Sequence, residues 1–189
     1  MTKVYFVRHA QPDLRNKSED RVLSNKGIKD SKLVLNYLLD KDIDVLVSSP
    51  YPRSIQTIEP LAKVLNKEMI LIEDLRERKV GKWVDDFNAY SRKQWNDFDY
   101  RILEGESLNE VQTRNIKALN KLLLENKNRN ICVGTHGTAL STIINYYDRT
   151  FGYNDFDRIK NIMPWIVVIS FDEQDNIIHI EEVDLLGTV

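Results

Sequence analysis

The sequence predicts a single α/β domain, a three-layer sandwich in which helices cover both faces of a mostly parallel sheet. Short apolar runs rich in β-favouring residues alternate along the chain with longer stretches of helical periodicity, which is the pattern of β-α-β units. The last two apolar runs are separated only by Asp172–Asp175, which predicts an antiparallel hairpin at one edge of the sheet. A length of 189 residues suits one domain spanning residues 1–189.

The predicted strands are the apolar runs that stop at polar or turn-forming residues. In chain order they are Lys3–Val7, Val45–Ser48, Met69–Glu73, Ile131–Thr135, Trp165–Phe171 and Asn176–Ile180. The strongest helical patterns lie between these strands, at Asn25–Leu39, Pro52–Leu65, Leu108–Glu125 and Gly137–Tyr146. Strands and helices are therefore expected to alternate until the final hairpin.

An aromatic segment interrupts this alternation and predicts a lid-like insertion at about residues 83–104. It holds six of the chain's 17 aromatic residues (3 Trp, 8 Tyr and 6 Phe), namely Trp83, Phe87, Tyr90, Trp95, Phe98 and Tyr100. The first three follow i, i+4, i+7 spacing, which favours a helix whose aromatic face packs on the domain. The alternative is a lid that presents aromatic side chains to a ligand, and both roles can hold at once.

Composition narrows the classes of partner. Lys plus Arg (27) nearly balance Asp plus Glu (29), so no overall field favours nucleic acid or an anionic membrane. No secretory signal is recognisable, and no apolar run approaches the roughly 20 residues needed to span a bilayer. A single cysteine excludes an intrachain disulfide. We therefore expect a cytoplasmic protein whose partner is a small molecule, with any anion-binding site confined to one place.

Reactive side chains follow four of the predicted strands. The first strand is followed by Arg8 and His9, the second by Arg53, the third by Glu77 and the fourth by His136. In an open α/β sheet, ligands bind outside the carboxyl ends of the strands. These side chains are therefore predicted to meet at one edge of the sheet, where two arginines suit a dianionic phosphate.

The chemistry of this set is phosphoryl transfer. The arginines offset the charge that repels a nucleophile, and nearby cations favour the neutral form of an imidazole. A neutral imidazole can attack phosphorus in line and form a phosphohistidine. A carboxyl group can protonate the departing oxygen and later accept a proton from the water that cleaves the intermediate. No metal ion and no cofactor are needed for this sequence of steps.

Six short segments together resemble a known family. They are "VRHA" at 7–10, "LSNKG" at 23–27, "SSPYPRSIQT" at 48–57, "LRERKVGKW" at 75–83, "GES" at 105–107 and "THG" at 135–137. Each is similar to a signature segment of the histidine phosphatase (phosphoglycerate mutase-like) superfamily, and they occur in the same order over nearly the whole chain. Ala10 stands where the signature usually has glycine, a small-for-small change that we expect to be tolerated.

The resemblance implies a role for each residue. His9 would be the phospho-accepting nucleophile and Glu77 the proton donor, and the phosphate clamp would consist of Arg8, Arg53 and His136. It also implies a substrate-binding role for residues around the pocket, namely Arg15, Asn16, Ser24 and Gly137. Many members have a pocket asparagine six positions after the nucleophile, where this chain has Arg15 with Asn16 next to it.

Other phosphoryl-transfer classes fit the sequence poorly. A cysteine phosphatase needs Cys-x5-Arg, but Thr138 stands six residues after Cys132. A P-loop needs Gly five residues before the Gly of Gly-Lys-Ser/Thr, and "GKW" at 81–83 has Arg76 there and lacks the hydroxyl. Three dispersed histidines do not form the dense cluster of a metal hydrolase.

Within the superfamily the choice lies between a phosphatase and a mutase. A mutase must exclude water and hold a second anionic group, which requires extra cations near the site. The aromatic segment at about residues 83–104 is short, and Arg92 and Lys93 are its only cations that are neighbours in sequence. The sequence therefore favours a metal-independent phosphomonoesterase acting on a small phosphorylated substrate. Mutase-type transfer and a non-catalytic relative that binds phosphorylated ligands stay open as alternatives.

Overall fold

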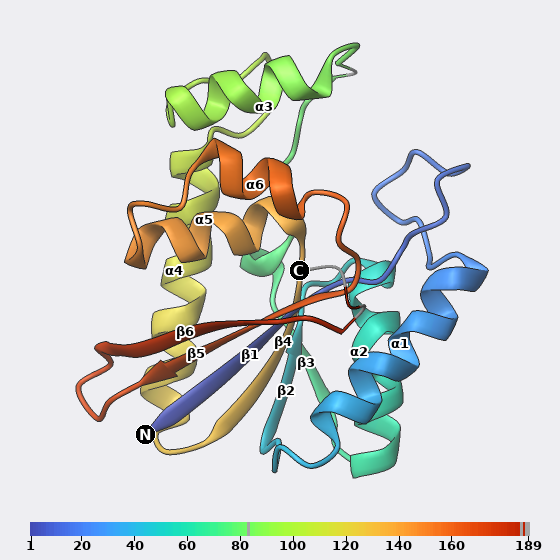
Figure 1. The fold of residues 1–189 in the computed structure, drawn as a ribbon, viewed down its shortest axis with the longest axis vertical. Coiled ribbons are helices and arrows are strands. Elements are labelled where there is room, and N and C mark those ends of the chain that lie inside the picture. The colour runs from blue at the N-terminus through green and yellow to red at the C-terminus, as the bar shows by residue number, and fades with distance from the viewer. Residues whose placement is uncertain (83, 186, 188–189) are drawn as a thin grey trace.

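The computed structural model describes residues 1–82, 84–185 and 187 and contains a six-stranded sheet with the strand order β3-β2-β4-β1-β5-β6 (Figure 1). The strands are β1 (Thr2–Arg8), β2 (Val45–Ser48), β3 (Met69–Leu71), β4 (Asn130–Thr135), β5 (Trp165–Phe171) and β6 (Ile177–Val183). The pairs β1–β4, β2–β4 and β2–β3 are parallel, whereas β1–β5 and β5–β6 are antiparallel. The predicted fold class, a mostly parallel sheet with an antiparallel edge, is confirmed.

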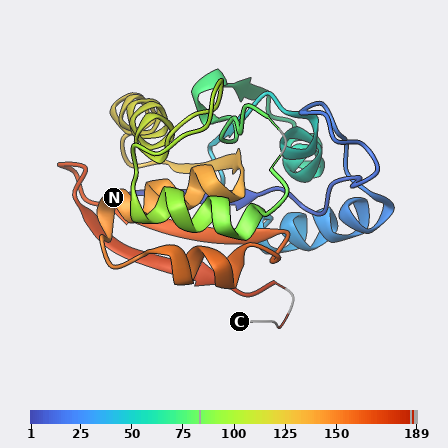
Figure 2. The same cartoon turned by 90° about the horizontal axis from the view of Figure 1, so that it is seen from above.

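Helices cover both faces of this sheet. They are α1 (Asn25–Leu38), α2 (Pro52–Leu65), α3 (Phe87–Asn96), α4 (Leu108–Glu125), α5 (Gly137–Tyr147) and α6 (Tyr153–Ile159), with a 3₁₀ turn at Glu73–Leu75. One core cluster joins α1 and α2 to one face, and the other joins α4, α5 and α6 to the opposite face. In Figure 1 α3 lies at one end of the molecule, above α5 and α6, and in Figure 2, which is seen from above, it lies in front of these two helices.

The central strand β1 shows how this arrangement positions a site. Val4 and Phe6 belong to one core cluster, whereas Tyr5 and Val7 belong to the other, because successive side chains of a strand point to opposite faces. Both faces of β1 are thus filled with apolar packing. A reactive side chain carried by this strand reaches a ligand only where the strand ends, at Arg8 and the residue that follows it.

Several boundaries differ from the sequence prediction. β3 ends at Leu71, and Glu73–Leu75 form a 3₁₀ turn instead of continuing the strand. β6 begins at Ile177 and extends to Val183, beyond the predicted end at Ile180. Helix α6 was not predicted. It is short, and its N-terminus is capped by the Asp155 carboxylate, which accepts a hydrogen bond from the Gly152 N–H (2.9 Å).

The aromatic segment contains α3, which begins at Phe87 because the Asp86 side chain accepts a hydrogen bond from the Ala89 N–H and caps the helix there. Trp83, the first residue of the predicted aromatic stripe, lies outside the described residues. Tyr90 and Trp95 are buried, and Trp95 packs against three aromatic rings, Phe98 of the same segment, Phe151 just before α6 and Phe156 within α6. Packing therefore accounts for these two rings, and the lid remains a prediction.

Within the described part of the chain, no helix is both long and apolar enough to cross a membrane.

Candidate active site

The carboxyl ends of β1, β2 and β4 meet at one edge of the sheet and deliver the predicted residues there. Arg8 is the last residue of β1 and pairs with Thr135 at the end of β4. The chains that leave β1 and β2 both continue to bond β4, since the His9 N–H donates to Thr135 O (3.1 Å) and the Ser49 N–H donates to Gly134 O (3.0 Å). His136 directly follows β4 and begins α5 as its N-cap.

The His9 ring is fixed in one orientation and one tautomer. Its Nδ1 lies 2.8 Å from Ala10 O, a carbonyl that can only accept, so Nδ1 carries the hydrogen. Its Nε2 accepts a hydrogen bond of 3.2 Å from the Nε of Arg53 and therefore presents a lone pair. The Ala10 N–H donates to Thr57 Oγ1 (2.9 Å) in α2, which anchors the loop that carries the ring.

His9 is neutral at neutral pH. Its side chain is buried, and this burial, followed by the charges of Arg53 and Arg8, holds the pKa of His9 well below its ordinary value of 6.5. The hydrogen bond to Ala10 O opposes this shift, whereas the charge of Arg21 reinforces it. Neutral imidazole is the nucleophilic form, so the surroundings prepare this ring to attack an electrophile.

Arg53 is the second residue of α2 and only 2% exposed. Its Nη1 donates to Glu19 O (2.6 Å), and its guanidinium stacks over the Tyr51 ring at 4.9 Å. Burial, and then the nearby charge of Arg21, lower the pKa of Arg53 to about 10. The side chain is therefore still a cation at neutral pH, and it lies directly beside the lone pair of His9.

Arg8 is anchored by main-chain carbonyls at the C-terminal end of α6 and just after it. Its Nη1 donates to Ile159 O (2.7 Å) and Ile162 O (3.1 Å), and its Nη2 donates to Lys160 O (2.7 Å). Its Nε is buried and has no hydrogen-bond partner among the residues that the structure describes. These bonds fix the guanidinium and leave its Nε edge for an anion, although burial lowers the pKa of Arg8 to about 10.

Gly137 leaves room for this guanidinium at the start of α5. A Cβ at Gly137 would lie 3.0 Å from the Cζ of Arg8 and 3.1 Å from its Nε. Any larger residue would therefore press on Arg8, which is predicted to line the phosphate pocket together with Gly137.

His136 is fully buried beside His9, with 5.2 Å between the two ring centroids. Its Nε2 lies 2.7 Å from Ser49 Oγ, and that oxygen also accepts a hydrogen bond from the Tyr51 N–H. Its Nδ1 is buried without a hydrogen-bond partner in residues 1–82, 84–185 and 187. Burial and then the charge of Arg53 hold the pKa of His136 well below 6.5.

Glu77 lies at the N-terminus of α5, next to His136. Its Oε2 accepts from the Thr138 N–H (3.0 Å), and its Oε1 accepts from the Ala139 N–H (3.1 Å) and from the Arg78 N–H (2.8 Å). A carboxylate fits this position because the first N–H groups of a helix lack intrahelical partners. The structure thus brings Glu77 and the other predicted catalytic residues to one edge of the sheet.

The predicted pocket residues of the first loop have hydrogen-bond partners within that loop or in α1. Arg15 has a side chain that is 91% exposed and pairs with Asp13, whereas the Asn16 side chain accepts from the Ser18 N–H. Ser24 caps α1 through a hydrogen bond from the Gly27 N–H. The structure therefore gives these three side chains local partners, and their role in binding substrate stays a prediction.

Two residues near the site were missed in the sequence. Ser49 lies in the quoted segment at 48–57, so its contact with His136 could have been anticipated from its position after β2. Arg21 had no distinguishing signal, since it is one cation in a polar loop. Its charge acts on His9 and on Arg53, and its Nε is buried without a partner among the described residues.

The two buried imidazoles predict a pH dependence of stability. Below about pH 6.5 the unfolded chain protonates both rings, whereas the folded chain keeps them neutral, so the free energy of unfolding should fall as the pH falls. Between pH 6.5 and 5.5 the loss should reach up to about 1 kcal/mol per ring. Urea unfolding at both pH values measures it, and His9→Asn should lose less than the wild type. An equal loss in that variant would contradict the assignment.

The geometry suits the binding of a dianion between two arginines beside a neutral imidazole. In the described ranges, no three His, Cys, Asp or Glu side chains are grouped so that they could hold a metal ion. Cys132 is buried inside β4, where burial raises the pKa of its thiol, so it is not presented at this edge. The site can thus stabilise a phosphoryl group, accept it on nitrogen and offer a carboxyl group nearby.

Comparison with known proteins finds a family that matches most of the chain. A model of the histidine phosphatase superfamily (branch 1) matches residues 4–181. A probable phosphatase of Schizosaccharomyces pombe, C1687.21, is 26% identical over 165 residues, which cover 84% of this chain and 78% of the relative. The probable phosphoglycerate mutase GpmB of Serratia proteamaculans is 27% identical over 159 residues, which cover 76% of this chain and 74% of the relative.

The fold is also similar to a solved structure of a mutant phosphoserine phosphatase from Entamoeba histolytica in complex with phosphoserine. The TM-score is 0.80, and the match covers 98% of this chain and 100% of that chain at 21% sequence identity. At this level of identity the likeness shows that the two chains share a fold.

Proposed function

This chain belongs to the histidine phosphatase superfamily and is a phosphatase of that superfamily, and we propose that it hydrolyses a small phosphomonoester through a phosphohistidine on His9, without a metal ion. One observation carries the proposal. The Nδ1 of His9 is tied to Ala10 O, so the lone pair of the neutral ring lies on Nε2, beside the Arg53 guanidinium.

In the first step, the phosphoryl group binds between Arg8, Arg53 and His136. The Ser49 hydroxyl accepts from the Tyr51 N–H, so its own proton is available to His136 Nε2, and the ring hydrogen then lies on Nδ1 as a donor to a phosphoryl oxygen. These donors stabilise the negative charge on the phosphoryl oxygens as the transition state forms.

The lone pair of His9 Nε2 then attacks phosphorus, and the bond between phosphorus and the ester oxygen breaks. Glu77 gives its proton to that oxygen, so the alcohol leaves neutral. In the second step, Glu77 takes a proton from water as the water oxygen attacks the phosphohistidine. The P–N bond breaks, inorganic phosphate is released and His9 returns to its neutral form.

Hydrolysis of a chromogenic aryl phosphate by the purified protein tests the proposal. A radiolabelled phosphomonoester should also label the protein on a histidine, in a bond that survives alkali and is lost in acid. Mutase-type transfer or ligand binding alone would release no inorganic phosphate, so the same assay separates these alternatives from hydrolysis. A protein that releases no phosphate from any tested phosphomonoester would overturn the proposal.

The identity of the substrate is the next choice. The Entamoeba phosphatase with the same fold was solved with phosphoserine, and the Serratia relative is named a phosphoglycerate mutase. We propose a small phosphorylated metabolite of this kind for the present chain. A screen that includes phosphoserine and phosphoglycerates beside sugar phosphates measures kcat/KM for each, and a strong preference for phosphorylated protein would contradict it.

Metal removal is expected to leave the rate unchanged. The two buried arginines supply the positive charge that a metal ion supplies in other phosphatases, and their pKa values of about 10 keep both charged at neutral pH. The measurement is the rate of aryl phosphate hydrolysis after treatment with a chelator and again after addition of Mg²⁺ or Zn²⁺. A rate that is lost on chelation and restored by either ion would contradict the mechanism.

A further inference from the structure

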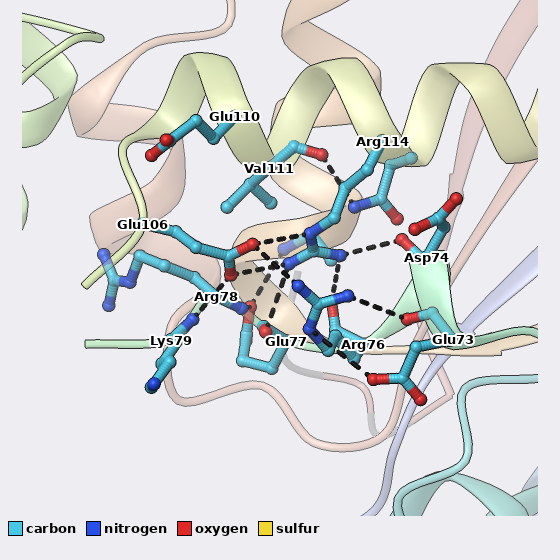
Figure 3. Close-up of polar contacts among 12 residues, drawn as sticks. Glu73, Asp74, Arg76, Glu77, Arg78, Lys79, Glu106, Glu110, Val111 and Arg114 are labelled. Atoms are coloured by element: carbon cyan, nitrogen blue, oxygen red, sulfur yellow. Dashed lines mark hydrogen bonds and ion pairs between the residues drawn. The ribbon is translucent and has the colours of Figure 1, made fainter. Parts of the chain in front are cut away.

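One side chain, that of Arg114, holds the main chain of the segment that carries Glu77. Residues 76–82 form neither helix nor strand, so the carbonyls of this stretch find their partners elsewhere. The guanidinium of Arg114, in α4, donates hydrogen bonds to carbonyls of this stretch (Figure 3). Its Nη1 donates to Asp74 O and to Arg76 O, each at 2.7 Å, and its Nη2 donates to Glu77 O at 3.2 Å.

Glu106 fixes Arg114 in this position. Its Oε1 accepts from the Nε of Arg114 (2.9 Å) and its Oε2 from the Nη2 (3.0 Å), which is a two-point contact. The same carboxylate accepts from the Lys79 N–H (2.9 Å) and from the Nη2 of Arg76 (3.0 Å). Burial alone would raise the pKa of Glu106, but these hydrogen bonds from Arg114 and Lys79 hold it below its ordinary value.

Two glycines allow the segments to approach so closely. Gly81 has a φ of +94°, and a Cβ there would lie 2.5 Å from Leu103 O. A Cβ at Gly105 would lie 2.4 Å from Val80 O. The Glu106 N–H donates across this contact to Lys79 O (2.8 Å). The short "GES" segment at 105–107 and the segment that carries Glu77 therefore form one packed unit.

We propose that Arg114 and Glu106 are positioning residues for Glu77. The inference rests on the proposed function, in which Glu77 protonates the leaving oxygen. The carboxylate of Glu77 is held by the N-terminus of α5, and its main chain is held by Arg114 of α4. Loss of the second anchor leaves a flexible segment between the two helices. A misplacement of about 1 Å in a catalytic group can cost about 10²-fold in rate.

The test compares Arg114→Met with Arg101→Met, a matched control in which the arginine also pairs with a carboxylate. Arg101 pairs with Glu110 at 2.6 Å, but its side chain is exposed and it does not contact residues 74–79 through any hydrogen bond in the described structure. The measured quantity is kcat/KM for an alkyl phosphate and for an aryl phosphate, because it reports the steps up to formation of the phosphohistidine and leaves out the later water step, in which Glu77 also acts. Proton donation matters far more for the alkyl leaving group, whose oxygen is the more basic.

Arg114→Met should lower kcat/KM for the alkyl phosphate by about tenfold to a hundredfold, and should change kcat/KM for the aryl phosphate by less than about threefold. Glu106→Gln should act in the same direction, and it replaces Arg114→Met if that variant does not fold. Arg101→Met should match the wild type. In a Glu77→Gln background, Arg114→Met should add less than about twofold, because both changes remove the same step.

Equal losses on the two phosphates, or losses that multiply in the double variant, would overturn the inference and leave a purely structural role for the pair. A wild-type protein that hydrolyses neither phosphate would overturn the proposed function and this inference with it. Amide hydrogen exchange gives a readout without turnover: the amides of residues 76–79 should exchange faster in Arg114→Met, whereas unchanged exchange there would also overturn the positioning role.

Discussion

The His9→Ala variant is expected to lose its phosphatase activity, to below about 1% of the wild-type rate. The Nε2 atom of His9 is the proposed nucleophile, and alanine removes it while leaving the arginines in place. The contacts with Ala10 O and Arg53 are made by the His9 ring itself, so the variant has no side chain held at this position to attack phosphorus. The rate of aryl phosphate hydrolysis measures the loss, and radiolabelling should show no phosphoenzyme in the variant.

His179→Ala is the matched control for this experiment. His179 lies in β6 with an exposed side chain, far from the edge of the sheet where His9 and His136 meet. That variant should keep the wild-type rate and form the phosphoenzyme. Circular dichroism should show that both variants are folded, since His9 lies outside the two apolar clusters. A folded His9→Ala protein that retains more than about 1% of the rate would remove His9 from the mechanism.

The Glu77→Gln variant is expected to separate two kinds of substrate. The kcat/KM for an alkyl phosphate should fall about 10²- to 10⁴-fold, whereas that for an aryl phosphate, whose leaving oxygen needs little help, should fall much less. Glutamine keeps an oxygen that accepts hydrogen bonds, so it can still accept an N–H group at the start of α5. The contrast between the two substrates therefore measures proton donation by residue 77 and not a change in the structure of α5.

Glu73→Gln is the control for this second prediction. Glu73 belongs to the same charged run, but its side chain is 70% exposed and its contact with Arg76 is 3.8 Å long, a surface pair worth about 0–1 kcal/mol. Its replacement should affect both substrates equally and by less than about threefold. If Glu77→Gln gave the same small and uniform effect, the proton would come from another group, and Asp13 and Asp74 would be tested next.

The elements that the sequence predicted best are those with a local start signal. Pro52 begins α2, and a capping box formed by Ser107 and Glu110 begins α4, so both helices have the predicted bounds. Helix α6 was missed because seven residues give too few turns for an apolar period to show. β3 was predicted too long because its apolar run continues to Ile72, whereas the chain turns at Glu73.

The candidate site was likewise predictable only in part. The meeting of His9, Arg53 and His136 could be predicted because parallel strands present their carboxyl ends at one edge of a sheet. The contacts that hold these residues could not. Arg8 is anchored by the carbonyls of Ile159, Lys160 and Ile162, and Arg114 by those near Glu77. A main-chain carbonyl is present in every residue, so no sequence pattern marks the ones that a guanidinium will bind.

The central position of β1 has a consequence for how the chain folds. Its two neighbours in the sheet are β4, which begins at Asn130, and β5, which begins at Trp165. On a ribosome the first strand is therefore made long before either partner, and its apolar residues Val4–Val7 have no partner strand until β4 has been made. Such distant pairings slow folding and expose strand edges that can aggregate. The synthesis of β4 and β5, and not the emergence of the first half of the domain, should set the moment at which this protein becomes an enzyme.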